Sequence, residues 1–371
     1  MKVLFDYWIM DHVKSGGIYR YYHNLYKEAK LNPSFNIEYK FACIFSESEI
    51  DYKNINLVKK PFRNSSNKFL SRSSKISTRI INSSYSYMAA NTSSFNIFHP
   101  TYYSNSINFN YRKKPVAITV YDMIHELYPS YFKSNDSVTQ LKKKCCSKAD
   151  IIFAISHQTK NDLVKLFDIS PDKIKVTYLD GGFENNETTP SSPKNLPSKY
   201  ILFVGQRSGY KNFDNFLSAI TPLLVNDPEL FLFCTGPHFT NVEKDKFIMS
   251  GISSKVIHHY ATDSEFYQIY SNALAFVFPS LYEGFGIPIL EAFSAGCPVL
   301  ASNSSSLAEI SEDGAILFDP NSKSEILNAT EKLIYNDFLR KSMITKGYQI
   351  KQKFSWKKTL TETIDGYKSI L

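Results

Sequence analysis

This 371-residue chain lacks long apolar runs, a paired set of cysteines and any Asp-x-Asp motif. No apolar stretch approaches the roughly 20 residues of a membrane-spanning helix, which excludes an integral membrane protein from our expectations. The five cysteines are scattered without the spacing of a disulfide framework or a metal site, so we expect buried, reduced thiols and a cytoplasmic protein. The absence of an Asp-x-Asp pair and of a His and Cys cluster predicts that the protein uses no metal and no cofactor.

Acidic residues are absent from residues 52 to 121, a window that holds eleven Lys and Arg. Residues 1–190 carry 26 basic and 17 acidic residues, whereas residues 191–371 carry 17 and 18, so the excess charge belongs to the first half. Residues 67–86 mix basic with apolar side chains. This pattern fits either a basic amphipathic helix on an anionic membrane or a solvated helix that packs its apolar side inward. No nucleic-acid-binding motif accompanies the charge, and we expect no nucleic-acid partner.

Short apolar strands alternate with helical patterns along the whole chain, which indicates an α/β protein with doubly wound parallel sheets. Residues 186–198 are rich in polar and turn-forming residues and read as a linker. We therefore expect an N-terminal Rossmann-like domain of residues 1–185 plus 355–371 and a C-terminal one of residues 199–354. Ligands of such sheets bind at the carboxyl ends of the strands, so we expect the two domains to face a central cleft. Strands are expected, among others, at residues 2–8, 96–99, 151–155, 200–204, 275–278 and 299–301.

The most informative run lies between the last two of these strands. An apolar strand ends at Pro279, a glycine-bearing loop follows, and a short helix begins near Pro288, where a missing N–H group has no cost. Such a loop presents backbone N–H groups and a helix N-terminus to a phosphate. Glu283 and Glu291 flank it, and carboxylates accept hydrogen bonds from hydroxyl groups. A phosphate site flanked by hydroxyl-binding groups indicates a nucleotide sugar. Further on, residues 306–309 fit a helix-capping box.

This run resembles the Glu-x7-Glu signature of the retaining glycosyltransferases of family 4. Within that family it is similar to the mannosyltransferase-like enzymes that build bacterial surface polysaccharides and O-antigen. The resemblance implies the GT-B fold, in which a last helix, here opened by Phe354-Ser355-Trp356, crosses back to the first domain. It also implies that Glu291 binds the ribose hydroxyls and Glu283 the donor sugar. The backbone that meets the sugar and the diphosphate would be that of Gly284, Phe285, Gly286 and Ile287.

Two further segments resemble the donor side of the family. Arg207 and Lys211 lie four residues apart beside glycines, a pattern that suits a diphosphate, and the resemblance assigns them the neutralisation of the leaving group. Gly16-Gly17-Ile18-Tyr19-Arg20-Tyr21 resembles the Gly-Gly-Ile-x-Arg-Tyr segment of many members, which places Gly17 at the donor.

On the acceptor side, Thr119 to Glu126 follow a strand and resemble a segment in which many members carry His-Asp. Asp122 matches and is expected to serve in catalysis, binding donor or acceptor hydroxyls. Tyr121 stands where the family has His, and either Tyr121 or His125 could substitute for it. His99 and Tyr102 end another strand and resemble an acceptor-lining segment, although His99 fits a core position equally well.

We therefore expect a retaining, metal-independent glycosyltransferase that moves a hexose to a lipid-linked or growing polysaccharide acceptor. A GDP-mannose-like donor is favoured, with a UDP-sugar as the alternative. Glu283, Asp122, Arg207 and Lys211 are the expected catalytic residues. The basic first domain predicts a peripheral position on the anionic inner face of the cytoplasmic membrane. Two alternatives are a GT-B sugar-nucleotide epimerase and a non-catalytic nucleotide-binding scaffold at the membrane surface.

Overall fold

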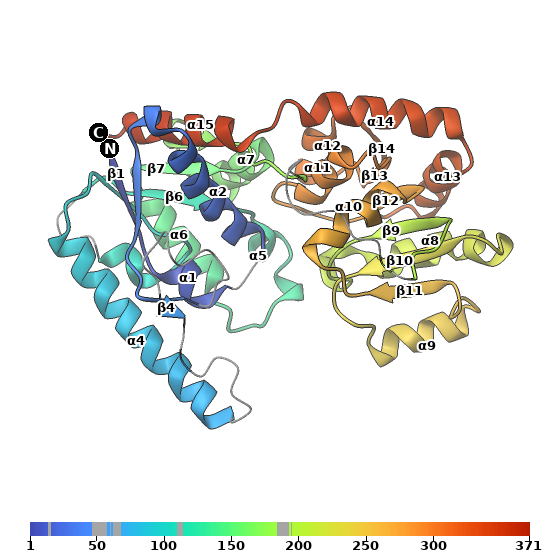
Figure 1. The fold of residues 1–371 in the computed structure, drawn as a ribbon, viewed down its shortest axis with the longest axis horizontal. Coiled ribbons are helices and arrows are strands. Elements are labelled where there is room, and N and C mark those ends of the chain that lie inside the picture. Colours follow the sequence, from blue (N-terminus) through green and yellow to red (C-terminus); the bar gives the residue numbers. More distant parts are fainter. Residues whose placement is uncertain are drawn as a thin grey trace. The chain divides into compact units, whose positions relative to one another are not determined.

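The computed structural model describes residues 1–13, 16–46, 58, 59, 61, 68–109, 114–183, 193 and 195–371, so most of the expected linker at 186–198 lies outside the described residues. The chain forms two compact units (Figure 1). Unit 1 contains Met1–Leu179 and Trp356–Leu371, and unit 2 contains Asp180–Ser355. Asp180 joins unit 2 through an ion pair with Lys351, in which Nζ lies 2.7 Å from Oδ1.

Unit 1 contains two three-stranded parallel sheets, ordered β2-β1-β5 and β6-β7-β8. A parallel bridge between Phe98 and Val116 joins them edge to edge. Its elements are β1 (Lys2–Phe5), α1 (Trp8–His12), α2 (Gly17–Leu31), β2 (Glu38–Phe41), β3 (Phe45–Ser46), β4 (Val58–Lys59), α4 (Lys68–Thr92), β5 (Ile97–His99), β6 (Ala117–Val120), α5 (Ile124–Leu127), α6 (Val138–Lys148), β7 (Ile151–Ala154), α7 (His157–Phe167), β8 (Ile174–Val176) and α15 (Trp356–Lys368).

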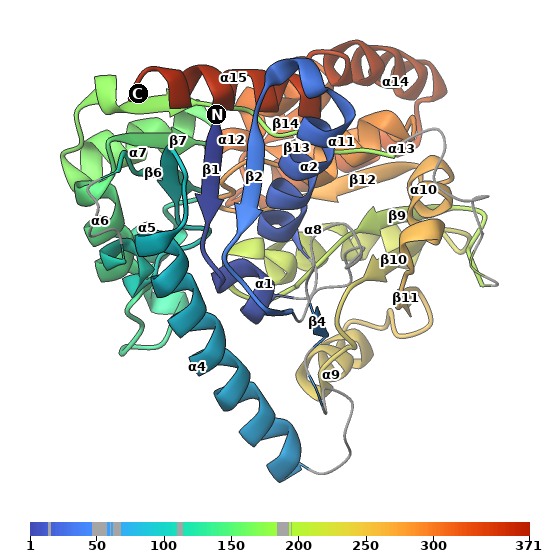
Figure 2. The same ribbon diagram turned by 60° about the vertical axis from the view of Figure 1, so that its left-hand side comes forward.

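The last helix, α15, packs on unit 1, as the GT-B resemblance predicts. It lies beside α2 over the strands (Figure 2). Gly366 allows the close approach, because a Cβ atom there would lie 2.4 Å from Cε1 of Phe153 in β7. Tyr367 of the same helix is fully buried. The C-terminal segment is therefore part of the core of the first unit.

Unit 2 is one six-stranded parallel sheet with the order β11-β10-β9-β12-β13-β14. The strand order reverses between β9 and β12, which is the switch point of a doubly wound sheet. Its elements are β9 (Tyr200–Phe203), α8 (Phe213–Asn226), β10 (Phe231–Thr235), α9 (Asn241–Met249), β11 (Val256–His259), α10 (Asp263–Ser271), β12 (Ala275–Phe278), α11 (Ile287–Ser294), β13 (Val299–Ser302), α12 (Ser305–Ser311), β14 (Ala315–Phe318), α13 (Lys323–Ile334) and α14 (Asp337–Lys351).

The first strand is shorter than the expected residues 2–8. It ends at Phe5, and Trp8 already begins helix α1. The cause is Asp6, whose buried carboxylate accepts hydrogen bonds from the backbone N–H of Trp8 at 3.3 Å and of Thr101 at 2.9 Å. These contacts turn the chain before a longer strand can form.

Candidate functional site

The two loops that follow β9 and β12 leave the sheet at its switch point. We call residues 204–212 the Lys211 loop and residues 279–286 the Glu283 loop. β9 and β12 are parallel neighbours, with Phe276 opposite Leu202, so their carboxyl ends meet at the same edge. The backbone N–H of Leu281 donates to the carbonyl of Tyr210 at 2.8 Å and joins the two loops directly.

An ion pair links the two loops at their centre. Nζ of Lys211 lies 2.6 Å from Oε1 of Glu283, and the two side chains are 21% and 13% exposed. Asn212 supports the turn: its backbone is left-handed, with φ of 58°, and its side-chain amide donates to the carbonyl of Pro279 at 3.1 Å. A cation and a carboxylate that the sequence places 72 residues apart are thus in contact.

Ser305 and Ser306 of α12 hold the Glu283 loop by hydrogen bonds. The sequence did not assign these two residues to the site. Ser305 Oγ accepts from the backbone N–H of Glu283 at 2.9 Å. Ser306 Oγ donates to the carbonyls of Glu283 and Phe285, at 2.8 and 2.6 Å. The expected capping box at residues 306–309 is therefore wrong, because the N-cap of α12 is Ser304 and the hydroxyl of Ser306 faces the loop. A run of serines after a strand was the signal for this support.

Glycine at position 286 is required by the geometry that starts α11. Its φ is 128°, and a Cβ atom would lie 3.3 Å from Cδ2 of Leu307. Helix α11 begins at Ile287 with Pro288 in its first turn, as predicted. Gly284 is buried, and the ring of Phe285 packs edge-on against Phe354 with centroids 6.0 Å apart. The backbone is therefore the part of Phe285 that a ligand could meet.

Glu291 lies on α11, where Tyr270 donates its hydroxyl to Oε2 at 3.1 Å. Tyr270 is fully buried in α10, so its hydroxyl is a fixed donor. The sequence offered no signal for this partner, because the side chains of α10 and α11 come into contact only in the folded structure. The contact holds one oxygen of Glu291 in a set direction, as a hydroxyl-binding carboxylate needs.

Arg207 is more buried than an exposed basic turn, with 8% of its surface accessible. Its Nε donates to Oε1 of Glu243 at 2.6 Å, and one terminal nitrogen donates to the carbonyl of Pro237 at 2.6 Å. The guanidinium also lies 4.6 Å from the ring centre of Phe239. The other terminal nitrogen, Nη1, is buried without a hydrogen-bond partner among the described residues. Nη1 is therefore a buried donor, and no partner among the described residues satisfies it.

Glu243 is a further site residue that the sequence did not single out. Burial alone would raise the pKa of its carboxyl, but hydrogen bonds from Arg207 and Thr240 outweigh burial and lower it. Thr240 and Glu243 form the capping box of α9. The counter-ion of Arg207 is thus held in place by a helix N-terminus.

Asp122 lies after β6 in unit 1, in a cluster around the buried Lys142. Nζ of Lys142 lies 2.7 Å from Oε2 of Glu126 and 3.8 Å from Oδ1 of Asp122. The same nitrogen donates to the carbonyl of Asp122 at 2.9 Å. Lys142 therefore fixes both the backbone and the charge of Asp122. His125 turns to Asp136, with Nε2 3.3 Å from Oδ2.

The structure places His99 and Tyr121 in the core of unit 1. His99 is fully buried, with Nδ1 2.7 Å from the hydroxyl of Tyr367 and Nε2 3.1 Å from Oγ1 of Thr119. Burial lowers the pKa of His99 to about 3, so the imidazole is neutral. The hydroxyl of Tyr121 donates to that of Tyr22 at 2.9 Å. These contacts make His99 a satisfied core residue and direct the hydroxyl of Tyr121 into the unit.

Tyr102 and Gly17 lie nearer the surface. Tyr102 is partly buried and stacks on Trp8 with ring centres 4.1 Å apart, and burial raises the pKa of its hydroxyl. Gly17 is the exposed first residue of α2, and Gly16 caps that helix with φ of 127°. The glycine pair thus opens α2, as the sequence suggested.

Within the described part of the chain, no group of three His, Cys, Asp or Glu residues is arranged to hold a metal ion. Nor does any helix in that part have the length and apolarity to cross a membrane. All five cysteines are described, and each is a buried thiol that forms no disulfide.

Comparisons with known proteins agree with this architecture. Residues 184–350 match the family model of glycosyl transferases group 1. The chain is 27% identical over 283 residues to the O-antigen chain mannosyltransferase B of Escherichia coli, covering 72% of this chain and 74% of that protein. It is 25% identical over 239 residues to the serotype-specific mannosyltransferase WbdA of Escherichia coli. That match covers 60% of this chain and 29% of WbdA, so the chain spans less than a third of the length of this relative.

Among solved structures, the chain is similar to sucrose-phosphate synthase from Thermosynechococcus elongatus. The TM-score is 0.73 at 15% sequence identity, and the match covers 99% of this chain and 98% of that one. This likeness shows the fold, which is GT-B. The chain therefore contains a glycosyl transferases group 1 domain and is a glycosyltransferase. The relatives that it matches include O-antigen mannosyltransferases.

Proposed function

We propose that this glycosyltransferase moves a mannose-like hexose from GDP-mannose to a lipid-linked or growing polysaccharide, with retention of configuration and without a metal. A UDP-sugar is the alternative donor. The single observation that carries the proposal is the contact between Lys211 and Glu283 at the switch point, 2.6 Å long, beside the N-terminus of α11. The names of the mannosyltransferase relatives favour the sugar.

The chemistry follows from these groups. A diphosphate that departs from the sugar carries growing negative charge, which the charges of Lys211 and Arg207 and the N-terminus of α11 stabilise. Glu283 orients the donor sugar, and Glu291 accepts hydrogen bonds from the ribose. The acceptor hydroxyl attacks on the face from which the diphosphate leaves, and an oxygen of that phosphate takes its proton. Glu283 then has no need to become covalently attached to the sugar.

Asp122 binds hydroxyls of the donor or the acceptor in this proposal. Its carboxylate is 30% exposed and is held by Lys142, so it is both accessible and fixed. A carboxylate that is fixed before the ligand arrives loses little conformational entropy on binding. Tyr102 is another acceptor-side residue near the surface of unit 1.

The test is a transfer assay with the full chain. GDP-mannose, UDP-glucose and UDP-galactose are each offered with a polyprenyl-diphosphate oligosaccharide, with the free oligosaccharide, or with no acceptor, in the presence of EDTA or Mg²⁺. We expect product only from GDP-mannose with the lipid-linked acceptor, equally with EDTA, and NMR of the new linkage should show retention. UDP-sugar conversion without an acceptor would identify the epimerase, and nucleotide binding without any turnover would identify the scaffold.

A matched pair of variants makes the assay specific. Glu283→Gln keeps the shape of the side chain and removes the charge that contacts Lys211, so we expect the rate to fall by about 100-fold or more. Glu331→Gln makes the same change at an exposed position of α13 and should leave the rate unchanged. Equal rates for the two variants would refute the role of Glu283.

A further inference from the structure

Helix α4 of unit 1 is packed with its polar side inward. Its buried side chains from Ser74 onward include Ser74, Thr78, Asn82 and Ser86, which recur every four residues. Such spacing defines one face of a helix. From Ser74 to Ser86 the buried face of this helix is therefore a row of small polar residues, and apolar side chains are buried only at its C-terminal end, at Ala89 and Ala90.

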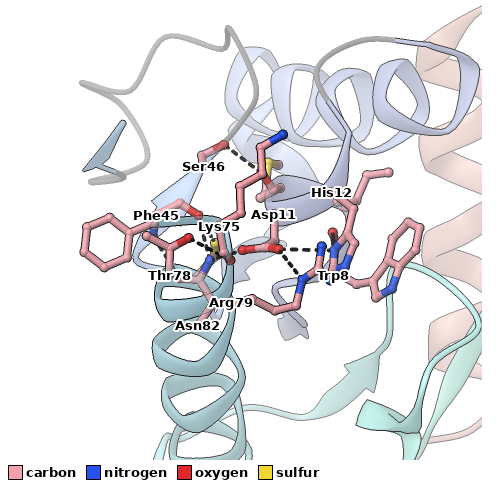
Figure 3. Close-up of polar contacts among 12 residues, drawn as sticks. Trp8, Asp11, His12, Phe45, Ser46, Lys75, Thr78, Arg79 and Asn82 are labelled. Atoms are coloured by element: carbon pink, nitrogen blue, oxygen red, sulfur yellow. Dashed lines mark hydrogen bonds and ion pairs between the residues drawn. The ribbon is translucent and has the colours of Figure 1, made fainter. Parts of the chain in front are cut away.

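Hydrogen bonds explain why this face is buried (Figure 3). The amide of Asn82 donates to Oδ1 of Asp11 at 2.7 Å and accepts from the backbone N–H of Phe45 at 2.9 Å. Arg79 adds an ion pair to Asp11, whose carboxylate is inaccessible to solvent. These contacts compensate the burial of polar groups and fix the rotation of the helix about its axis.

The opposite face exposes apolar side chains. Ile76 is 54% exposed and Ile80 is 61% exposed, one turn apart, and the same side of the helix continues to Tyr87. Ile81 and Met88 are exposed on its flank, at 44% and 51%. The hypothesis of a solvated helix that packs its apolar side inward is therefore wrong for Ile76, Ile80 and Ile81. An exposed apolar row of this kind marks an interaction surface.

Charge indicates what that surface binds. α4 contains no acidic residue, and Arg72 and Lys75 are exposed at its described N-terminal end. The side chains of Phe69 and Leu70, and most of the other basic residues between 52 and 121, lie outside the described residues. Arg72 lies one turn before the exposed Ile76. A cation beside exposed isoleucines complements a surface with negative headgroups over an apolar interior, which is the composition of an anionic bilayer.

We propose that the outer face of α4, formed by Ile76, Ile80, Ile81, Tyr87 and Met88, binds the surface of an anionic membrane. Arg72, one turn before Ile76, contacts the headgroups. This face is a single row of side chains along the helix, about 18 Å long from Ile76 to Met88 at about 1.5 Å per residue. The inference rests on the proposed function in one respect, because a lipid-linked acceptor is what makes this position useful to the enzyme.

The test is co-sedimentation of the full chain with vesicles. One set is phosphatidylcholine alone, and in the other about a third of the lipid is phosphatidylglycerol. We expect binding to the anionic vesicles only, with a fall in affinity as salt rises. Arg72→Gln should weaken binding by about fivefold at low salt, the effect of one charge.

The apolar side is tested by Ile76→Ser with Ile80→Ser, which should weaken vesicle binding by about tenfold or more. Ile248→Ser is the matched control: Ile248 is 67% exposed on α9 of the other unit, and its variant should bind vesicles as the wild type does. Each variant should still bind GDP without vesicles, which shows that it is folded.

If the Ile76→Ser, Ile80→Ser variant binds anionic vesicles as tightly as the wild type does, the proposal is overturned. It is also overturned if the wild type binds no vesicles. A dimer that these substitutions convert to a monomer would also overturn it, because the face would then belong to a second copy. Vesicle binding through α4 by a chain that transfers no sugar would refute the proposed function and leave this inference standing.

Discussion

His99 should make the stability of unit 1 depend on pH. Its pKa is about 3 in the folded protein, against an ordinary value of 6.5, because burial disfavours the charged form. Below pH 6.5 the unfolded chain binds a proton that the folded chain refuses, so stability is lost as the pH falls. Between pH 7 and pH 5 the loss is about 2 kcal/mol, at about 1.4 kcal/mol for each unit below 6.5.

Urea unfolding followed by tryptophan fluorescence measures this effect in the right unit, because both tryptophans, Trp8 and Trp356, lie in unit 1. His99→Gln removes the titrating group, so the variant should lose about 2 kcal/mol less than the wild type between pH 7 and pH 5. His157→Gln, at an exposed position of α7, controls for the substitution and should follow the wild type. Parallel pH profiles for His99→Gln and the wild type would refute the reasoning.

Three further substitutions test contacts of the candidate site. Glu243→Gln leaves the buried Arg207 without a counter-ion, so urea unfolding should show a loss of about 3 kcal/mol in the free energy of unfolding. Calorimetry should show weaker GDP binding, and unchanged GDP affinity would contradict this expectation. Gly286→Ala forces a side chain into a left-handed position and should cost about 1–2 kcal/mol; a thermal midpoint equal to that of the wild type would refute the strain. Lys142→Met leaves the carboxylate of Glu126 without its cation and should lower the free energy of unfolding in urea by about 3–5 kcal/mol. Adding Glu126→Gln should restore most of this loss if the loss comes from an unpaired charge.

Local patterns were sufficient to predict much of unit 2. Apolar runs identified the strands, and Pro279, Pro288 and Gly296 marked the loop and the two ends of α11. Proline and glycine act through their own backbone restrictions, so a sequence shows their effect without knowledge of the fold. The last helix was also predictable from its own residues, although its place on unit 1 came from the resemblance.

Partners distant in sequence could not be predicted. The contact of Lys211 with Glu283 depends on β9 lying next to β12, which no local pattern reveals. The same holds for Tyr270 beneath Glu291 and for Glu243 beside Arg207.

Buried polar groups were the other difficulty, since a hydrophobic pattern assigns polar residues to the surface. Asp6 shortened the first strand, and the polar face of α4 turned inward because Asn82 found Asp11 and Phe45 as partners. Ser306 likewise bonded carbonyls of a loop and not its own helix. In each case a specific tertiary hydrogen bond outweighed the local preference.

The central claim is that a nucleoside diphosphate binds at the Lys211 and Glu283 loops, and calorimetric titration of GDP tests it most directly. Lys211→Met removes the cation and keeps most of the side chain's length, so the account predicts a loss of affinity of about 10–100-fold. Lys246→Met is the control, because Lys246 is an ion-paired lysine on α9 of the same unit, 2.8 Å from Asp214, and GDP should bind this variant as it binds the wild type. Equal affinity of GDP for Lys211→Met and the wild type would contradict the account.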